Sequence, residues 1–150
     1  MTMKVTMNIQ DKFKKITTEH EESLLFAEKI LKIAESDDKD ELLAGIEIIK
    51  KYYADELELH FQHEERTIFA PLYKEYREHI GVAPALLKEH GFLRLLVDRI
   101  ELSSAKKDLN DFALVLRDHT LVEDKELFPL IEKLFTEKQL EAIATYTPAD

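Results

Sequence analysis

Four histidines of this chain fall where the apolar stripe of a predicted helix faces the core. They are His20, His60, His90 and His119. Two carboxylates share those stripes, Glu64 and Glu123, each four residues after one of the histidines. Residues four apart lie one turn above each other on the same helix face. Each pair therefore presents an imidazole and a carboxylate side by side, a combination that binds metal ions in the cores of helix bundles.

The two glutamates decide between a structural and a metal-binding role for the histidines. A single histidine on an apolar stripe is more often a hydrogen-bonded core residue than a ligand. A carboxylate, however, loses several kcal/mol of hydration in a dry core unless a cation pairs with it. The predicted inner stripes offer no Lys or Arg to supply that charge. We therefore expect the cation to be a bound metal ion.

The number of donor atoms favours two metal ions over one. Four imidazoles provide one bond each and two bridging carboxylates provide two each, which exceeds the needs of a single tetrahedral zinc with an open position. Two ions that also share an oxide or hydroxide would each have about five ligands and room for a small exogenous one. Imidazole and carboxylate suit iron best, with manganese or zinc as alternatives.

Other polar side chains near the cluster are candidates for supporting roles. Three lie one step off the inner stripes, where orienting a ligand or a surface position is favoured over direct metal binding. They are His63, Glu65 and Asp124. A proton relay needs titratable groups that lead away from the metals, and three candidates lie on or beside the stripe of His60. They are Tyr53, Glu56 and His63. His79 lies in a turn region, where we expect it to be solvated.

Long helices are required to position these residues. Glycine and proline number only three and four, which is typical of long helices and not of a turn-rich sheet. Apolar residues three and four apart predict four helices, interrupted by polar or Pro-containing breaks. They cover about 8–35, 41–71, 84–100 and 109–127. Pro84 suits a first helical turn, whereas Pro71 is expected to disturb the second helix. Thr136 with Gln139 predicts a capping box and a short fifth helix.

Short connections place successive helices antiparallel, so the expected fold is an all-α, up-down-up-down four-helix bundle. A rise of about 1.5 Å per residue tests whether the histidines meet at one level. Counted from the turns between them, His60 matches His90, and His90 matches His119, to within about one helical turn. His20 matches His60 less closely, with an offset of roughly 5 to 8 Å.

Composition sets further bounds on the protein. With 150 residues, 45% of them hydrophobic, the chain suits one domain spanning 1–150. A formal net charge of -10 without a basic cluster argues against nucleic acid as a partner. The absence of cysteine excludes disulfides, thiolate ligands and iron–sulfur clusters. No stretch has the length of a signal-peptide core or membrane span, so we expect a soluble cytoplasmic protein without a membrane partner.

The order His, HxxxE, His, HxxxE on successive predicted helices resembles the hemerythrin-like (HHE cation-binding) domains over nearly the whole chain. "EH" stands at Glu19-His20 and Glu89-His90, and "LFP" closes the last segment. A ferritin-like site is excluded because no glutamate lies three residues before any histidine. The resemblance implies a four-helix bundle around a non-heme, oxo- or hydroxo-bridged di-iron centre, with both glutamates bridging. Its implied ligands are His20, His60, Glu64, His90, His119 and Glu123.

The sequence differs from the dioxygen-carrying hemerythrins at two places. Those proteins have two histidines four apart on the third helix, whereas Leu86 and Arg94 flank His90 at that spacing. Their last carboxylate lies five residues after its histidine, which would select Asp124. We favour Glu123, because a spacing of four keeps the pair on one face. The four-His, two-Glu set instead resembles hemerythrin-like domains associated with nitric oxide response, iron-centre repair, and iron or oxygen sensing.

Two classes of function follow from this resemblance. In the first, a binding protein holds two ferrous ions and captures dioxygen or nitric oxide at an open iron position, for sensing, storage or stress response. In the second, the same centre is an enzyme that reduces nitric oxide or peroxide and requires a redox partner. Iron storage, or delivery for iron-centre repair, is a third possibility.

Overall fold

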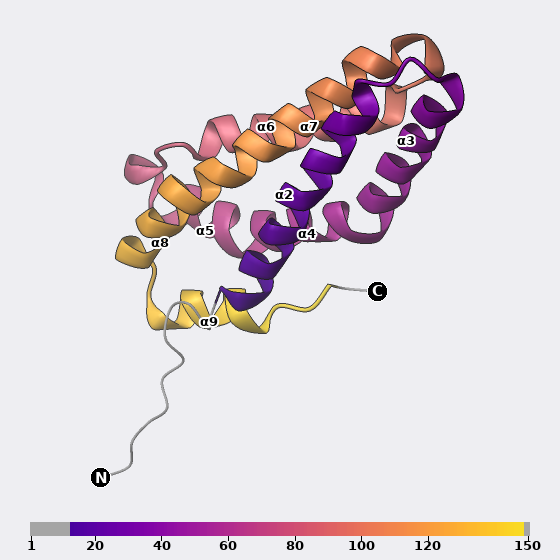
Figure 1. The fold of residues 1–150 in the computed structure, drawn as a ribbon. Coiled ribbons are helices and arrows are strands. Elements are labelled where there is room, and N and C mark those ends of the chain that lie inside the picture. Colours follow the sequence, from indigo (N-terminus) through magenta and orange to yellow (C-terminus); the bar gives the residue numbers. More distant parts are fainter. Residues whose placement is uncertain (1–12, 149–150) are drawn as a thin grey trace.

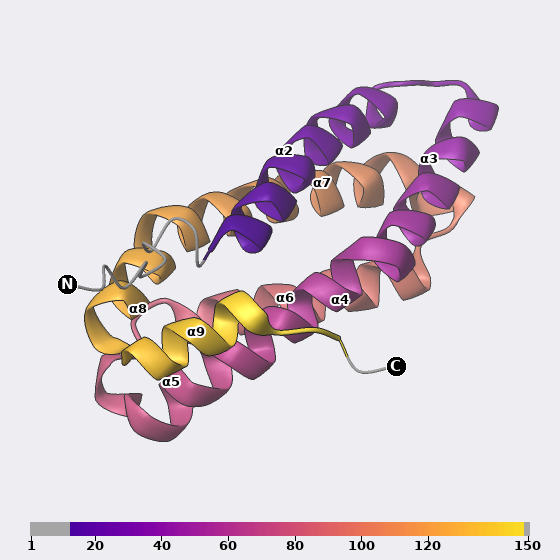
Figure 2. The same cartoon turned by 90° about the horizontal axis from the view of Figure 1, so that it is seen from below.

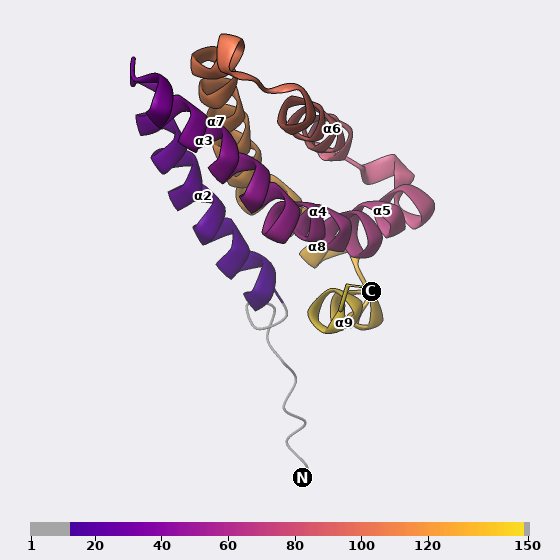
Figure 3. The same ribbon diagram turned by 90° about the vertical axis from the view of Figure 1, so that its right-hand side faces the viewer.

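The structure, a computed structural model, describes residues 13–148 of the chain. These residues are helical and contain no strand (Figure 1). The long helices run side by side in alternating directions, and a short helix packs across one end (Figures 1 and 3). This architecture confirms the expected all-α bundle with a short fifth helix near the carboxyl end. Within the described residues, no helix is long and apolar enough to cross a membrane.

Four helical rods make up the bundle. The first is α2 (Lys14–Ala34), and the third is α6 (Ala83–Arg99). The second consists of α3 (Lys39–Tyr52), α4 (Glu58–Glu64) and α5 (Ala70–Glu75), joined by π-helical turns at Tyr53–Leu57 and Glu65–Phe69. The fourth consists of α7 (Ala105–Val122), a π-helical turn at Glu123–Leu127, and α8 (Phe128–Leu134). Short 3₁₀ turns occupy Arg77–His79 and Leu102–Ser104, and α9 spans Glu137–Thr145.

Local sequence signals explain most of the helix boundaries. Asp38 caps α3 by accepting a hydrogen bond from the backbone N–H of Asp40 at 2.8 Å. Thr136 forms the expected capping box at the start of α9. Pro84 lies in the first turn of α6, as expected. The fourth helix begins at Ala105, earlier than predicted, because Ala105 is buried at its first turn. The predicted start of the first helix, at residue 8, lies outside the described residues.

The π-helical turns bear on two expectations about the second rod. Regular α-helix is interrupted just before Pro71, as expected, by the π-helical turn Glu65–Phe69, but the rod continues past Pro71 to Glu75. The π-helical turn Tyr53–Leu57 adds a residue to one turn and so shifts the inward face. Leu57 is consequently buried, while Glu56, which was predicted to face inward, is exposed.

Two apolar clusters fill the bundle, one toward each end. The first gathers around Ile30, Ile49, Leu96 and Leu109. The second gathers around Ile16, Leu72, Leu86 and Ile131, and includes Leu140 and Ile143 of α9. Along each rod, the histidine on the inner stripe lies between residues of one cluster and residues of the other. The buried polar residues therefore form a layer between two apolar cores, and α9, which runs alongside the second rod in Figure 2, contributes to the second core.

Candidate metal centre

The four inner histidines come from four different rods and turn their Nε2 atoms toward two glutamates at the centre. Nε2 of His20 lies 3.2 Å from a Glu64 oxygen and 3.0 Å from a Glu123 oxygen. The remaining close distances are 3.1 Å for His60 with Glu64, 3.3 Å for His90 with Glu64 and 3.1 Å for His119 with Glu123. All six side chains are buried. The four histidines meet at one level, as the level matching predicted. The looser fit expected for His20 is not seen, because its Nε2 lies as close to the glutamates as those of the other three histidines.

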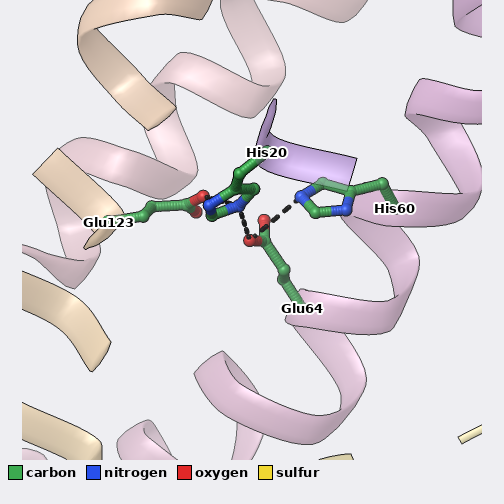
Figure 4. A group of neighbouring side chains, drawn as sticks. All are labelled: His20, His60, Glu64 and Glu123. Carbon is green, nitrogen blue, oxygen red and sulfur yellow. Dashed lines mark hydrogen bonds and ion pairs between the residues drawn. The ribbon is translucent and has the colours of Figure 1, made fainter. Parts of the chain in front are cut away.

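These six residues form two overlapping groups, within each of which the potential ligand atoms lie within 4.8 Å of one another. One group contains His20, His60, Glu64 and Glu123, and the other contains Glu64, His90, His119 and Glu123. Figure 4 shows the first group, in which the Glu64 carboxylate points between the imidazoles of His20 and His60. Each histidine belongs to one group and each glutamate to both. The two groups therefore share both carboxylates and differ in their histidines.

Three carboxylate oxygens at the centre test whether a metal fits. They are Glu64 Oε1 and both side-chain oxygens of Glu123, which are buried and accept no hydrogen bond, although imidazole nitrogens lie 3.0 to 3.3 Å away. A buried carboxylate requires a positive charge close by, which protonated imidazoles or a metal cation can supply. Imidazole nitrogens and carboxylate oxygens directed at the same space form a donor set that divalent transition metals bind well. The residues present therefore fit a metal-binding role.

A family model for the hemerythrin HHE cation binding domain matches residues 11–131. The chain belongs to this family. HHE domains bind metal cations, and the match includes all six residues of the two groups. No curated protein and no solved structure matches the chain at the significance required of a relative.

In this HHE domain, Glu123 and its neighbour Asp124 have different environments. Glu123 points into the centre and is fully buried. Asp124 is 40% exposed and accepts a hydrogen bond from Nδ1–H of His20 at 2.7 Å. The geometry therefore supports Glu123 as the last metal-facing carboxylate, with Asp124 orienting a histidine from behind.

The same arrangement recurs at the other three histidines of the HHE domain. Each donates its Nδ1–H to a carboxylate at the edge of the bundle. The acceptors are Glu19 for His60 at 2.7 Å, Glu65 for His90 at 2.8 Å and Glu89 for His119 at 2.9 Å. The sequence pointed to Glu65 and Asp124 as orienting residues but not to Glu19 and Glu89. Glu19 and Glu89 could have been identified from the sequence, because on every rod a carboxylate residue stands next to a residue that faces the centre.

Aromatic rings enclose the imidazoles of the HHE domain. Phe61 stacks on His90 with ring centroids 3.9 Å apart, and Phe128 stacks on His20 at 5.3 Å. Phe69 meets His90 edge-on at 5.7 Å. These rings fix the imidazole planes and exclude water from the layer. The periodicity of a single helix could not show this, because each ring stacks on an imidazole from another rod.

The electrostatics of the metal-free centre follow from close contact between histidines and carboxylates. Burial lowers the pKa of His60, but the charge of Glu64 and the hydrogen bond to Glu19 outweigh it and raise the pKa to about 9. For His119, contacts with its own carboxylate partners likewise outweigh burial and raise the pKa to about 10. The pKa is also raised for His20 and His90. Without metal, contact with the carboxylates thus favours the protonated form of these imidazoles.

The expected supporting residues lie in different places. The hydroxyl of Tyr53 donates a hydrogen bond to Glu58 at the side of the bundle. His63 is buried but turned toward α9, where its Nε2–H donates to the Ile143 carbonyl at 2.8 Å and its ring stacks on Tyr146. Burial also lowers the pKa of His63, which keeps it neutral. His79 is exposed, as expected. These positions link His63 to the packing of α9 against the second rod.

Proposed function

We propose that this HHE domain holds two iron ions between His20, His60, Glu64, His90, His119 and Glu123, and binds dioxygen or nitric oxide at an open iron position. Such binding would serve sensing, storage or a stress response. The observation that carries the proposal is the pair of overlapping groups that share both glutamates. Through this sharing, two imidazoles and both carboxylates would be available to hold each ion.

The donor set supports iron over the alternative metals. Zinc sites are usually tetrahedral and are satisfied by four protein donors, or by three and a water. A centre of mixed imidazole and carboxylate donors with further open positions is typical of non-heme iron. Manganese and zinc remain the competitors that a metal analysis must distinguish. Ferrous iron would supply the electron density that a diatomic ligand takes up on binding.

The surroundings of the centre support a small ligand. The layer is bounded by two packed apolar cores, and Phe61 and Phe128 lie directly against the imidazoles. A buried layer of this kind favours a diatomic molecule over large or charged ligands, whose hydration it cannot replace. The residues that face the metals thus bind and orient them, while the aromatic rings exclude water.

A chain of hydrogen bonds favours one alternative, in which the centre reduces nitric oxide or peroxide. The hydroxyl of Tyr53 donates to Glu58, and Arg94 donates to both Glu58 and Glu65 at 2.8 Å. Glu65 in turn accepts from His90. This chain joins a partly exposed tyrosine to a metal-facing imidazole, which is a route along which a redox partner could deliver electrons.

Spectroscopy of the loaded protein distinguishes binding from turnover. The protein is loaded anaerobically with ferrous iron and exposed to a measured amount of dioxygen or nitric oxide. Reversible spectral change, restored when the gas is removed, supports the binding role. Repeated consumption of nitric oxide or peroxide with an added reductant supports the enzyme instead. A protein that takes up ferrous iron but shows neither response would contradict both and leave iron storage.

A further inference from the structure

We propose that Glu19, Glu65, Glu89 and Asp124 form a closed ring of positioning residues that holds all four inner histidines in the tautomer required for metal binding. The inference rests on the proposed metal site and extends it to residues that do not touch the metals. Each histidine has one carboxylate partner, and the four pairs follow a fixed order around the bundle.

The order of the ring follows the order of the rods. Glu19 on α2 accepts from the histidine of α4, and Glu65, just after α4, accepts from the histidine of α6. Glu89 on α6 accepts from the histidine of α7, and Asp124, just after α7, accepts from the histidine of α2. Each rod therefore orients the imidazole of the next rod, and the fourth orients that of the first.

A shared sequence rule produces this geometry. Each of the four carboxylates is the immediate chain neighbour of a residue that faces the metals. Glu19 precedes His20, Glu89 precedes His90, and Asp124 follows Glu123. Successive residues on a helix point about 100° apart, so when one faces the centre the next reaches the adjacent rod. One pair of neighbouring residues thus supplies a ligand on its own rod and a hydrogen-bond acceptor for the next.

The chemistry of the acceptors fixes the tautomer. An ionised carboxylate can only accept hydrogen bonds, so the proton of a neutral imidazole stays on Nδ1 and the Nε2 lone pair points inward. Such outer carboxylates also strengthen the basicity of the ligand nitrogen. The four side chains are between 23% and 40% exposed, so each keeps contact with water. Glu64 and Glu123, which face the metals, are 0% exposed.

One member of the ring has additional support. Arg94 donates hydrogen bonds to both oxygens of Glu65, at 2.8 and 3.1 Å, and its guanidinium lies 5.4 Å from the ring centre of Phe61. Phe61 in turn stacks on His90. The Glu65–His90 contact is therefore the most firmly held of the four, and we expect its loss to weaken metal binding most.

Zinc as a diamagnetic probe, with histidine-labelled protein in NMR, tests the ring. The wild type should show four imidazoles bound through Nε2 with a protected Nδ1–H. In Glu89→Gln, the resonance that shifts or exchanges faster should belong to His119 on the next rod, not to the adjacent His90. In Glu19→Gln it should belong to His60. Zinc affinity, measured by chelator competition, should fall about 10- to 100-fold in each variant.

Glu22→Gln is the matched control, because Glu22 is exposed on the same helix as Glu19. It should leave both the affinity and the four Nδ1–H resonances unchanged. Asp124→Asn provides a second test if Glu89→Gln does not fold, since Asp124 is the most exposed member of the ring. Variants that match the control in affinity and tautomer would overturn the ring while leaving the metal site intact. A wild type that binds no zinc would overturn the metal site and the ring together.

Discussion

Replacing Glu64 by glutamine should abolish binding of both metal ions, whereas replacing one histidine should abolish binding of only one ion. The reason is that both glutamates belong to both groups of ligands, while each histidine belongs to one. Under anaerobic loading with ferrous iron, we expect about two ions per chain in the wild type, because the centre offers two positions that share these carboxylates. His60→Gln and His119→Gln should each retain about one ion, and Glu64→Gln should retain close to none.

The same difference should appear in stability. A metal that binds only the folded state adds about 2.7 kcal/mol to the free energy of unfolding when its free concentration is one hundred times Kd. Two ions should therefore add about 5 kcal/mol in the wild type, about 2.7 kcal/mol in either histidine variant and close to zero in Glu64→Gln. The relevant quantity is the gain on adding metal, because Glu64→Gln also leaves buried imidazoles unpaired and destabilises the metal-free protein.

Metal analysis after removal of free iron gives the number of bound ions. Urea unfolding with and without iron gives the increase in the free energy of unfolding that iron produces. His79→Gln is the control, because His79 is exposed and lies in a turn outside the centre. It should keep both ions and the full gain in stability. A Glu64→Gln protein that retains as much iron as His60→Gln would refute the shared-glutamate geometry. So would a histidine variant that loses both ions.

Three further predictions concern the rest of the bundle. In the metal-free protein, the raised pKa values of His60 and His119, about 9 and about 10, exceed the unfolded value of about 6.5. These two protonated histidines therefore stabilise the folded state fully below about pH 6.5, and this stabilisation is lost as the pH rises through 9 to 10. The urea midpoint of the metal-free protein should fall over that pH range, and an increase would contradict the raised pKa values. Arg94→Lys should destabilise the protein by about 1 to 2 kcal/mol in urea unfolding, because lysine cannot reproduce the fork that holds two carboxylates. An Arg94→Lys protein as stable as the wild type would contradict this role of the guanidinium. Gly45→Ala should cost about 1 to 3 kcal/mol, because a Cβ would lie 2.7 Å from a side-chain carbon of the facing helix. Gly91→Ala, with nothing within 4 Å of the new Cβ, should be neutral or stabilise by up to about 1 kcal/mol, and equal effects of the two substitutions would contradict this packing.

Much of the fold was predictable because its signals are local. The three-and-four spacing of apolar residues, the Thr136 capping box and the short connections each predict a helix or its end. The candidate ligands followed from the same spacing, since charged groups on an inner stripe require a partner. These inferences need only the geometry of a single helix and the order of the rods.

The features that escaped prediction depend on contacts between rods or on departures from regular helix geometry. The π-helical turn Tyr53–Leu57 moved Glu56 to the surface, although a uniform repeat places it inward. Glu19 and Glu89 reach histidines on other rods, which the periodicity of one helix cannot show. The link between His63 and α9 likewise depends on how the fifth helix docks.

The central claim is that two iron ions lie between the four histidines and two glutamates. Anomalous diffraction at the iron absorption edge, from crystals of protein purified from iron-supplemented cells, tests it most directly. We expect two peaks roughly 3.5 to 4 Å apart, one beside His20 and His60 and the other beside His90 and His119. A single peak, a peak elsewhere in the bundle, or a signal at the zinc or manganese edge in place of iron would contradict it.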